Sequence, residues 1–370
     1  MFLSSLQVKN FKNISSISLP ELGRVNIITG RNGAGKTNLL QAIYFLSTLS
    51  VNFKSYLQAI KFGEAFFSVG GELISEDLKK SVEATFGGNK DLKLKLNGNS
   101  VAKKSDYIGE CRVVNFGFED IDVVKGSPME RRKSINILIA QSNRAYLKAL
   151  QKYTAVLANK NKMLATAADA KGSVDRTLLS AFNEQLVCEG AGVVAMRKKA
   201  VEFLLPHFKE KYKIISGERE EVELAYKCSF ETDPSKGIED AFREKLEVLE
   251  KAEIFRKTSL VGPHRDDLLF LINGKDSKYF ASDGQQRSIV FSLRLAEYEY
   301  IKKETKDEPL ILLDDVFYEL DAERKGGVIS FFRDMPQIFI VSLDDDFAFG
   351  NSFKKAKLIR IRDGMLENGL

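Results

Sequence analysis

The stretch GRNGAGKT, Gly30 to Thr37, decides how the rest of the chain is interpreted. It matches the pattern GxxxxGK followed by Ser or Thr, in which a glycine-rich turn wraps around phosphate oxygens. The apolar run Val25–Ile28 precedes it, and apolar residues at helical spacing follow it from Leu39 to Leu49. Strand, glycine turn and helix in this order are the context that the motif requires. We therefore predict a nucleotide-binding P-loop rather than a turn that carries Lys-Thr by coincidence.

The groups of this turn are suited to hold ATP together with Mg²⁺. Backbone N–H groups and the helix N-terminus would face negatively charged oxygen. We expect Lys36 to reach the β- and γ-phosphates, and the Thr37 hydroxyl to ligate Mg²⁺. The residues predicted to contact the nucleotide are Gly30, Arg31, Asn32, Gly33, Ala34, Gly35, Lys36, Thr37 and Asn38.

A second motif, LILLDD, supplies a carboxylate for the metal. An apolar strand of this kind, buried on both faces, belongs in the middle of a parallel sheet, so its carboxyl end should emerge near the P-loop. We predict that Asp314 is the metal-associated residue and that Asp315 orients or deprotonates the attacking water. Lys36 and Asp315 are thus predicted catalytic residues. The alternative is an acidic pair that caps a strand end.

Composition and length limit the class of protein. The chain has 370 residues, 44% of them apolar, and a net charge of +5, which is typical of a folded globular protein. No window offers the roughly 18 uncharged apolar residues of a membrane span, and the N-terminus lacks the order of a secretory signal. We expect a cytoplasmic protein. Two histidines and three widely spaced cysteines argue against a metal centre built from His or Cys, so oxygen ligands are expected.

The remaining pattern places an inserted helical region within an α/β body. Alternating runs from Ala65 to Phe118, with an Asn97-Gly98 turn, predict a meander of strands. Pro128 opens a helical half, whose two long segments are separated near Gly172 and predict a projecting hairpin. Residues 212–228 look like a small β-hairpin. Strands alternate with helices at both ends of the chain, so its N- and C-terminal parts should form one body.

The stretch ASDGQQR, Ala281 to Arg287, sets a polar turn directly before a predicted helix. It resembles the signature loop of the ABC ATPase superfamily, in which a serine and a glycine clamp the γ-phosphate of ATP held by the opposite subunit. The resemblance implies that Ser282, Gly284 and Gln285 contact the nucleotide of a second copy, with Ser282 contributing to catalysis. A plain helix N-cap is the alternative for Ser282.

Successive blocks of the chain resemble the RecF family of bacterial recombination-repair ATPases, which is related to SMC heads. They are GRNGAGKTNLLQAIYFLS, EDIDVVKGSPMERRKSIN, YTAVLANKNKML, LVGPHRDDLLFLING, ASDGQQR and PLILLDDVFYELD. The likeness extends from the first strand to RIRDG near the C-terminus. GPHRDD, Gly262 to Asp267, is the block most specific to this family.

The resemblance implies an α/β fold, an ABC-type P-loop ATPase head in two lobes. Residues 1–125 would form the N-terminal part of lobe I, with the P-loop and a mixed β-subdomain. Residues 126–295 would form a mostly helical lobe II, with a short helical-hairpin arm and the signature turn. Residues 296–370 would complete lobe I with the Walker B aspartates and the D-loop. Glu319, Leu320 and Asp321 match the D-loop, and Asp321 is expected to contact the nucleotide.

The family's activity is implied in the same way. The resemblance implies ATP-dependent homodimerisation, binding of duplex and gapped DNA, and slow, DNA-dependent ATP hydrolysis. It also implies work with RecR and RecO, and indirectly with RecA, to place RecA on gapped DNA. Two other classes share the nucleotide motifs: a structural SMC-like ATPase, which needs a far longer coiled coil, and an ABC transporter ATP-binding subunit, whose switch histidine is absent after QIFIVS.

DNA contacts require cations presented to phosphates. The candidates also include Lys133, Lys148 and residues 197–199. A solvated helix face is the alternative for every basic candidate, including the five named below. We expect sequence-tolerant binding. The side chains predicted to contact DNA are Arg131, Arg132, Lys152, Lys160 and Lys162.

The chain departs from the family pattern at several positions. Tyr318 stands where serine is usual, Asn136 where aspartate is usual, Gln41 where glutamate is common, and Phe118 where proline is usual. The segment VNFKS lacks an expected arginine. None of these changes removes a group predicted to hold phosphate, metal or water, so they bear on the D-loop and on coupling between lobes.

Overall fold

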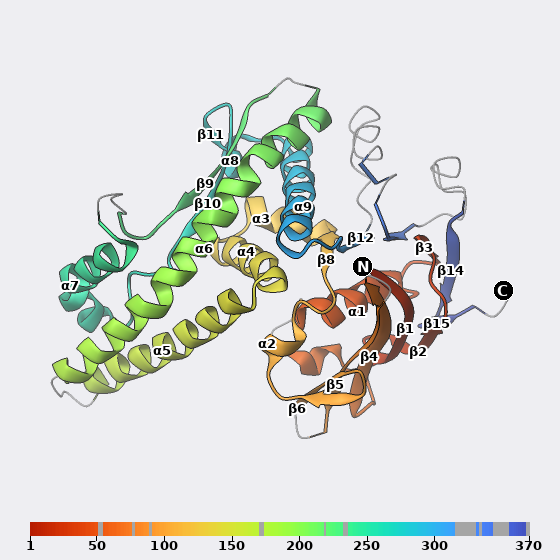
Figure 1. The fold of residues 1–370 in the computed structure, drawn as a ribbon, viewed down its shortest axis with the longest axis horizontal. Coiled ribbons are helices and arrows are strands. Elements are labelled where there is room, and N and C mark those ends of the chain that lie inside the picture. The colour runs from red at the N-terminus through yellow and green to blue at the C-terminus, as the bar shows by residue number, and fades with distance from the viewer. Residues whose placement is uncertain are drawn as a thin grey trace. The chain divides into compact units, whose positions relative to one another are not determined.

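The computed structural model divides into two compact units, which are described separately. Unit 1 comprises Met1–Ile121, Lys211–Arg219 and Ser282–Leu370, and unit 2 comprises Asp122–Glu210 and Glu220–Ala281. Most of their elements are labelled in Figure 1. The predicted lobe boundaries stay a prediction. The structure describes residues 1–50, 55–75, 78–88, 91–169, 174–217, 220–231, 236–314, 331–332, 335–342 and 355–367.

Unit 1 is built on one mixed sheet. Its strands follow the order β7-β6-β5-β4-β1-β2-β15-β14-β3-β13-β12-β8. The antiparallel part consists of β1 (Phe2–Phe11), β2 (Ile14–Leu19), β4 (Phe66–Ser75), β5 (Leu78–Gly87), β6 (Asp91–Leu96) and β7 (Asn99–Val101). The parallel part consists of β3 (Val25–Thr29), β8 (Val113–Phe116), β12 (Leu310–Asp314), β13 (Ile338–Val341) and β14 (Lys357–Arg362). The short strand β15 (Met365–Leu366) joins the two parts.

The central parallel strands β12 and β13 are continuous apolar runs that are buried on both faces. Leu310 to Leu313 of β12 are fully buried, and β12 pairs in parallel with β13 on one side and β8 on the other. Continuous apolar runs are typical of strands buried on both faces. The prediction that LILLDD lies inside a parallel sheet is confirmed, and Asp314 is the last residue of its strand.

One face of the antiparallel part packs against helix α1 (Lys36–Thr48). Phe45 of α1 lies edge-on to Phe67 of β4, with ring centroids 5.1 Å apart, and Phe67 lies edge-on to Phe11 at 5.2 Å. Such pairs add stability beyond apolar burial. The predicted meander is confirmed for Phe66–Val101, whereas Val113–Phe116 (β8) lies in the parallel part of the sheet. Asn97 and Gly98 take the positive φ angles (50° and 77°) that a tight hairpin turn requires.

Among the described residues of unit 1, the labelled helices other than α1 and α9 (Asp283–Thr305) are short. They are η1 (Tyr56–Ala59), α2 (Lys104–Tyr107) and η2 (Phe118–Ile121). The long helix α9 packs on β8 and η2. No helix within the described ranges is both long and apolar enough to cross a membrane.

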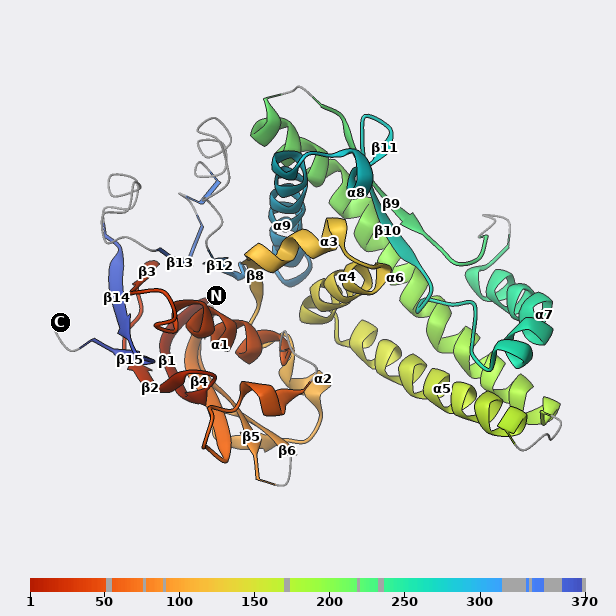
Figure 2. The ribbon, with the colours of Figure 1, turned by 180° about the vertical axis from the view of Figure 1, so that it is seen from behind.

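Unit 2 is mostly helical, and Figure 2 shows its long helices from behind. Helices α5 and α6 run side by side, linked by a hydrogen bond between Lys152 and Glu189. The predicted hairpin is thus present, although its turn at 170–173 lies outside the described residues. The helices are α3 (Asp122–Lys125), α4 (Pro128–Ser142), α5 (Arg144–Asp169), α6 (Arg176–Ser216), α7 (Ile238–Arg256) and α8 (Ser277–Phe280).

One secondary-structure prediction was wrong. The segment 212–228 is not a hairpin, because helix α6 continues through Ser216 and only β9 (Val222–Lys227) is a strand. Strand β9 pairs instead with β10 (Asp267–Ile272), which turns into β11 (Lys275–Asp276). The apolar pair Ile214-Ile215 looks like part of a strand in the sequence. It is helical because extending the existing helix α6 adds one hydrogen bond per residue without a new nucleation cost.

A fully buried ion pair joins α5 to α7 in unit 2. The Lys160 ammonium donates to the Glu253 carboxylate at 2.6 Å, and both side chains are at most 1% exposed. Glu253 also accepts from the Ser259 hydroxyl (2.9 Å) and the Leu260 amide (2.7 Å). Burial lowers the pKa of Lys160, and the carboxylate opposes that shift. The cost of burying each of these two charges is therefore offset by the opposite charge of its partner.

Replacing Lys160 by Met should leave the Glu253 carboxylate buried without its counter-charge. We expect a loss of about 3 kcal/mol in the free energy of unfolding, measured by urea titration with circular dichroism. Lys152→Met is the matched control on the same helix, because its ammonium is exposed and its ion pair is worth at most about 1 kcal/mol. Equal losses for the two variants would contradict this account of the core.

Candidate functional site

The P-loop joins β3 to α1 through a turn that only glycine can follow at three positions. Gly30, Gly33 and Gly35 have φ angles of +148°, +78° and +114°. A β-carbon on Gly30 would lie 2.2 Å from the carbonyl oxygen of Ile361 in β14, so that strand leaves no space for a side chain. The turn can therefore approach a ligand with its backbone, and the first N–H groups of α1 have no partner inside the helix.

Lys36 and Thr37 begin α1 with their polar atoms at the turn. The Lys36 ammonium donates to the carbonyl oxygens of Gly30 (2.6 Å) and Arg31 (3.2 Å) and is buried. The Thr37 hydroxyl donates to the Asp314 carboxylate at 3.1 Å. The structure thus brings together three side chains that the sequence assigned to phosphate and metal.

The turn is anchored by residues that the sequence analysis did not identify. The Asn13 side chain, in the β1–β2 turn, donates to the Gly33 carbonyl at 2.7 Å and accepts from the Asn38 amide at 2.7 Å. The Gly364 amide donates to the Ala34 carbonyl at 2.9 Å. These contacts hold the turn's carbonyl groups from outside. No motif marks Asn13, because its role arises only from the pairing of β1 with β2.

The oxygens at this site fit Mg²⁺. Thr37 and Asp314 present a hydroxyl and a carboxylate oxygen to each other, and Mg²⁺ in nucleotide sites uses one or two such ligands together with phosphate oxygens and water. Within the described ranges, no group of three or more His, Cys, Asp or Glu side chains is placed to hold a metal. At this edge of the sheet, the protein therefore offers a few oxygen ligands that would add to the nucleotide's phosphate oxygens around Mg²⁺.

The turn at Ser282 forms a capping box at the start of α9. The Ser282 hydroxyl accepts from the Gln285 amide (3.3 Å), and the Gln285 side chain accepts from the Ser282 amide (2.7 Å). The N-cap interpretation is thus correct within one copy. Ser282 is exposed, and its O–H hydrogen is not used by the cap, so a hydrogen bond to an external phosphate oxygen is compatible with this geometry.

Helix α9 is fixed to the end of β8 by a buried arginine. Arg294 donates to Asp120 at 2.8 Å and to both carboxylate oxygens of Glu297 at 2.8 and 2.7 Å. Asp120 in turn accepts from the Gly117 amide at 2.7 Å. Since β8 pairs with β12, this contact ties the helix that carries Ser282 to the strand that carries Asp314.

Several predicted site residues lie outside the described ranges. These are Asp315 and the D-loop residues Glu319, Leu320 and Asp321, and their assigned roles stay predictions. Among the departures, Gln41 accepts a hydrogen bond from Lys12, next to Asn13. Tyr318 and residues 51–54 are also outside the described ranges.

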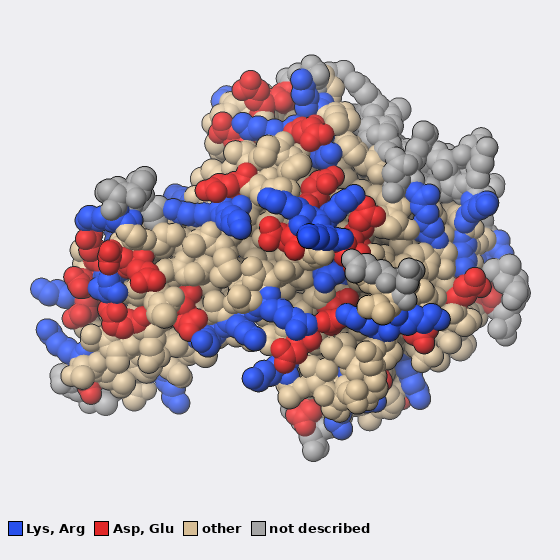
Figure 3. All heavy atoms as spheres, in the orientation of Figure 1, with Lys and Arg blue, Asp and Glu red and all other residues tan. Residues whose placement is uncertain are grey.

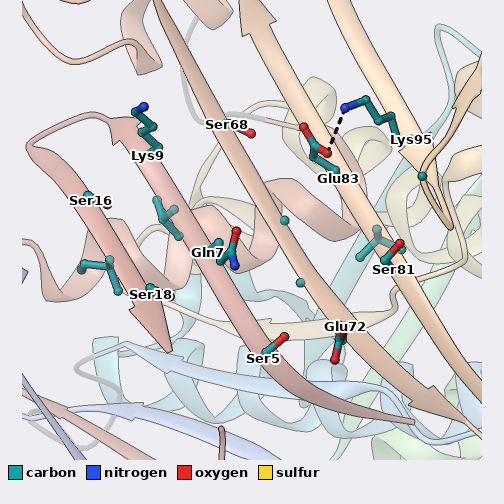
Figure 4. A pocket seen from close by; sticks show the side chains of 16 residues that line it. Ser5, Gln7, Lys9, Ser16, Ser18, Ser68, Glu72, Ser81, Glu83 and Lys95 are labelled. Atoms are coloured by element: carbon teal, nitrogen blue, oxygen red, sulfur yellow. Dashed lines mark hydrogen bonds and ion pairs between the residues drawn. The ribbon is translucent and has the colours of Figure 1, made fainter. Parts of the chain in front are cut away.

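A hollow of about 600 Å³ lies on the other face of the antiparallel strands (Figure 4). Its lining includes Gly70, Gly71 and several serines, and its Lys95 forms an ion pair with Glu83 at 3.3 Å. No P-loop residue lines it. We assign it no part in nucleotide binding.

The predicted DNA contacts need correction at two positions. Arg131 is 6% exposed and donates to both oxygens of Asp267, at 2.7 and 3.0 Å. Lys160 is in the buried pair with Glu253. Neither side chain is presented to a phosphate, so the prediction that they contact DNA was wrong. Lys152 and Lys162 are exposed on α5, and Arg132 is half-buried.

The family-specific block GPHRDD is the centre of a buried polar cluster in unit 2. Gly262 has φ +124°, and a β-carbon there would lie 2.4 Å from the Tyr153 hydroxyl. His264 accepts from that hydroxyl through Nδ1 (2.6 Å), because its Nε2 faces the Ser259 carbonyl and must carry the proton. Burial lowers the pKa of His264 to about 4, so it is neutral at pH 7. These contacts make the block a structural link, not an acid–base centre.

Arg197 of α6 completes this cluster. Its guanidinium is 2% exposed and donates to the Pro263 carbonyl at 2.7 Å and to Asn136 of α4 at 2.9 Å. Asp266, fully buried, lies 3.8 Å away as its counter-charge. The departure at Asn136 thus replaces a carboxylate by a neutral acceptor and keeps the hydrogen bond.

Comparison with known proteins agrees with these observations. The family model described as RecF/RecN/SMC N terminal domain matches residues 2–363. The DNA replication and repair protein RecF of Bacillus cytotoxicus is 35% identical over 371 residues, covering 99% of this chain and 98% of that protein. A RecF of Bacillus cereus has the same identity and coverage. The chain belongs to the RecF family.

Solved structures place this RecF-family chain in the same fold. The structure described as the recombination mediator protein RecF with ATP in the RecFOR pathway has a TM-score of 0.89 and 30% identity, covering 99% of this chain and 97% of that chain. An SMC head from Pyrococcus furiosus, with bound ScpA domain, has a TM-score of 0.53 at 18% identity, covering 99% and 95%. The predicted ABC-type ATPase head, related to SMC heads, is therefore confirmed.

Replacing Asn13 by Ala should loosen the P-loop of this RecF-family protein. Two hydrogen bonds to the turn would be lost, and we expect ATP affinity to fall about ten-fold in a calorimetric titration with MgATP. Asn99→Ala, an exposed position in β7 of the same unit, should leave the affinity unchanged. Indistinguishable affinities for the two variants would show that Asn13 does not position the turn.

Proposed function

We propose that this protein binds and slowly hydrolyses ATP, and that ATP binding pairs two copies on duplex DNA at single-strand gaps. Full-length similarity to RecF supports the assignment. The observation that carries it is the P-loop, with its lysine and threonine against the last residue of β12.

ATP binding follows from the residues at the turn. The first N–H groups of α1 would receive phosphate oxygens, and Lys36 would exchange its two carbonyl partners for the β- and γ-phosphates. Thr37 and Asp314 would hold Mg²⁺, which supplies neutralisation of the charge on the phosphates. Asp315, which follows Asp314 in the sequence, would orient the attacking water.

Pairing of two copies follows from the turn at Ser282. Its hydroxyl and the N-terminus of α9 would face the γ-phosphate of ATP held by the other copy. Gly284 and Gln285 would support that contact, and Asp321 of the D-loop would cross between copies. ATP would then act as the link between two copies, and hydrolysis would release them.

The setting proposed for this activity is recombinational repair and maintenance of replication forks. We propose RecR, with RecO, as protein partners and RecA as the protein whose loading on gapped DNA is assisted. A structural SMC-like ATPase is not favoured, since RecF relatives match the chain over 99% of its length. An ABC transporter subunit is not favoured for the same reason.

The proposal is tested by measuring mass in solution and DNA affinity together. In an Asp315→Asn background, which should block hydrolysis, ATP is expected to convert monomers to dimers in analytical ultracentrifugation. Ser282→Arg in the same background should abolish the dimer, because the larger cation would displace the capped turn from the phosphate.

Affinity for duplex DNA is then compared with ATP, with ADP and without nucleotide at two salt concentrations. ATP should strengthen binding at least about ten-fold, and salt should weaken it through release of counterions. The proposed function would be refuted if the protein stayed monomeric under saturating ATP, or if its DNA affinity were the same with ATP, with ADP and without nucleotide.

A further inference from the structure

On the face of the molecule seen in Figure 3, the described Lys and Arg side chains do not form one continuous basic stripe. Figure 3 shows Lys and Arg interspersed with Asp and Glu over the face in view. A DNA-binding cation therefore has to be identified by whether it already forms an ion pair. A Lys or Arg side chain bonded to a carboxylate has little charge left for a phosphate. The polar cluster around GPHRDD allows this distinction to be made.

Every carboxylate of this cluster is already engaged. Asp267 accepts from Arg131 through both oxygens and from the Leu268 amide. Asp266 is fully buried, accepts from the Tyr226 hydroxyl and the Ser229 amide, and is the counter-charge of Arg197.

Glu253 forms its ion pair with Lys160. Asn136 accepts a hydrogen bond from Arg197 through a neutral amide oxygen. No carboxylate of the cluster is left for a further cation.

Two guanidinium groups remain at the edge of the cluster with no ion pair among the residues that the structure describes. Arg132 donates only through Nη1, to the Asp266 carbonyl at 2.7 Å. Arg265 donates through Nε and Nη2 to the Ser259 carbonyl, at 3.2 and 2.8 Å. Each guanidinium has five N–H donors, so both retain donors that are not committed.

The two arginines are electrostatic neighbours held by the same turn. Arg132 bonds the residue that follows Arg265 in the chain. Burial, first, and repulsion from Arg197 and Arg265 lower the pKa of Arg132, whereas Asp267 and Asp266 act in the opposite direction. Arg265 is exposed and Arg132 half-buried, so the pair is open to solvent.

The support beneath this pair is rigid. Arg197 bonds Tyr146 at 3.1 Å and the Pro263 carbonyl, and neutral His264 is held between Tyr153 and Ser259. Donors fixed by such contacts lose little conformational entropy when they bind an anion. A phosphodiester, whose two non-bridging oxygens share one negative charge, matches two forked guanidinium groups.

We propose that Arg132 and Arg265 form a phosphate-binding pair that contacts the DNA backbone, and that the GPHRDD turn serves to present it. The inference rests on the proposed DNA binding and deepens it by naming the contact. It contains no base-reading element, in agreement with sequence-tolerant binding.

The test compares two double variants in the Asp315→Asn background with ATP. Arg132→Gln with Arg265→Gln removes two unpaired cations, while each Gln amide can still donate to its carbonyl. Lys236→Gln with Arg243→Gln removes the same net charge from unit 2, but from cations already bonded to Glu244, and to Glu184 and Asp240. The probe is a dye-labelled duplex of arbitrary sequence, and fluorescence anisotropy is recorded over a range of salt concentrations.

The first variant should weaken DNA binding about ten-fold or more, and should lower the slope of log affinity against log salt by about 1 to 2. The control should change the affinity by no more than about two-fold and should leave the salt slope unchanged. A parallel variant, Arg132→Lys with Arg265→Lys, keeps the charge and should keep the salt slope, which separates loss of charge from any loss of folding.

The outcomes separate the two claims. If the parent protein binds DNA with ATP and the Gln pair binds it as tightly as the control does, the phosphate pair is refuted and the proposed function stands. If the parent protein binds no DNA with ATP, the proposed function itself is refuted, and the DNA contact with it.

Discussion

The nucleotide site depends on the register of the parallel strands in unit 1. Val341 of β13 pairs with Ile28 of β3 on one side and with Asp314 of β12 on the other. The end of β12 is thereby level with the start of the P-loop, and Thr37 meets Asp314. A slip of one residue would move Asp314 along the strand by about 3.3 Å and turn its side chain to the opposite face. Such a slip would separate the Asp314 carboxylate from the Thr37 hydroxyl.

The same framework holds the other elements of the site. β14 closes over Gly30, the β1–β2 turn supports the P-loop through Asn13, and β8 holds α9 through the bond between Asp120 and Arg294. The cradle for phosphate and the turn at Ser282 are therefore positioned by one sheet within a single copy. In unit 2 the GPHRDD turn holds elements together in a similar way, since hydrogen bonds connect it to α4, α5 and α6.

Much of this could be predicted from sequence, and the failures have physical causes. The P-loop context and the buried strand of β12 follow from local pattern, because glycine positions and apolar runs are imposed by backbone conformation and burial. Asn13 was missed because its partner lies across a strand pair. Lys160 was misassigned because a lysine on a helix looks the same in sequence whether it meets water or a buried carboxylate such as Glu253. Pairing over long sequence separation is not visible in local pattern.

The central claim is that each ATP is held by the P-loop of one copy and the Ser282 turn of the other. The most direct measurement mixes equal amounts of a Lys36→Ala protein and a Ser282→Arg protein and follows ATP hydrolysis in the presence of DNA. Each variant alone should be inactive, because neither can pair with itself. Mixed dimers are then the only dimers that form, and each contains one intact site of two, so the mixture should recover up to about half of the wild-type rate. A mixture no more active than its separate components, although mixed dimers form, would contradict the account.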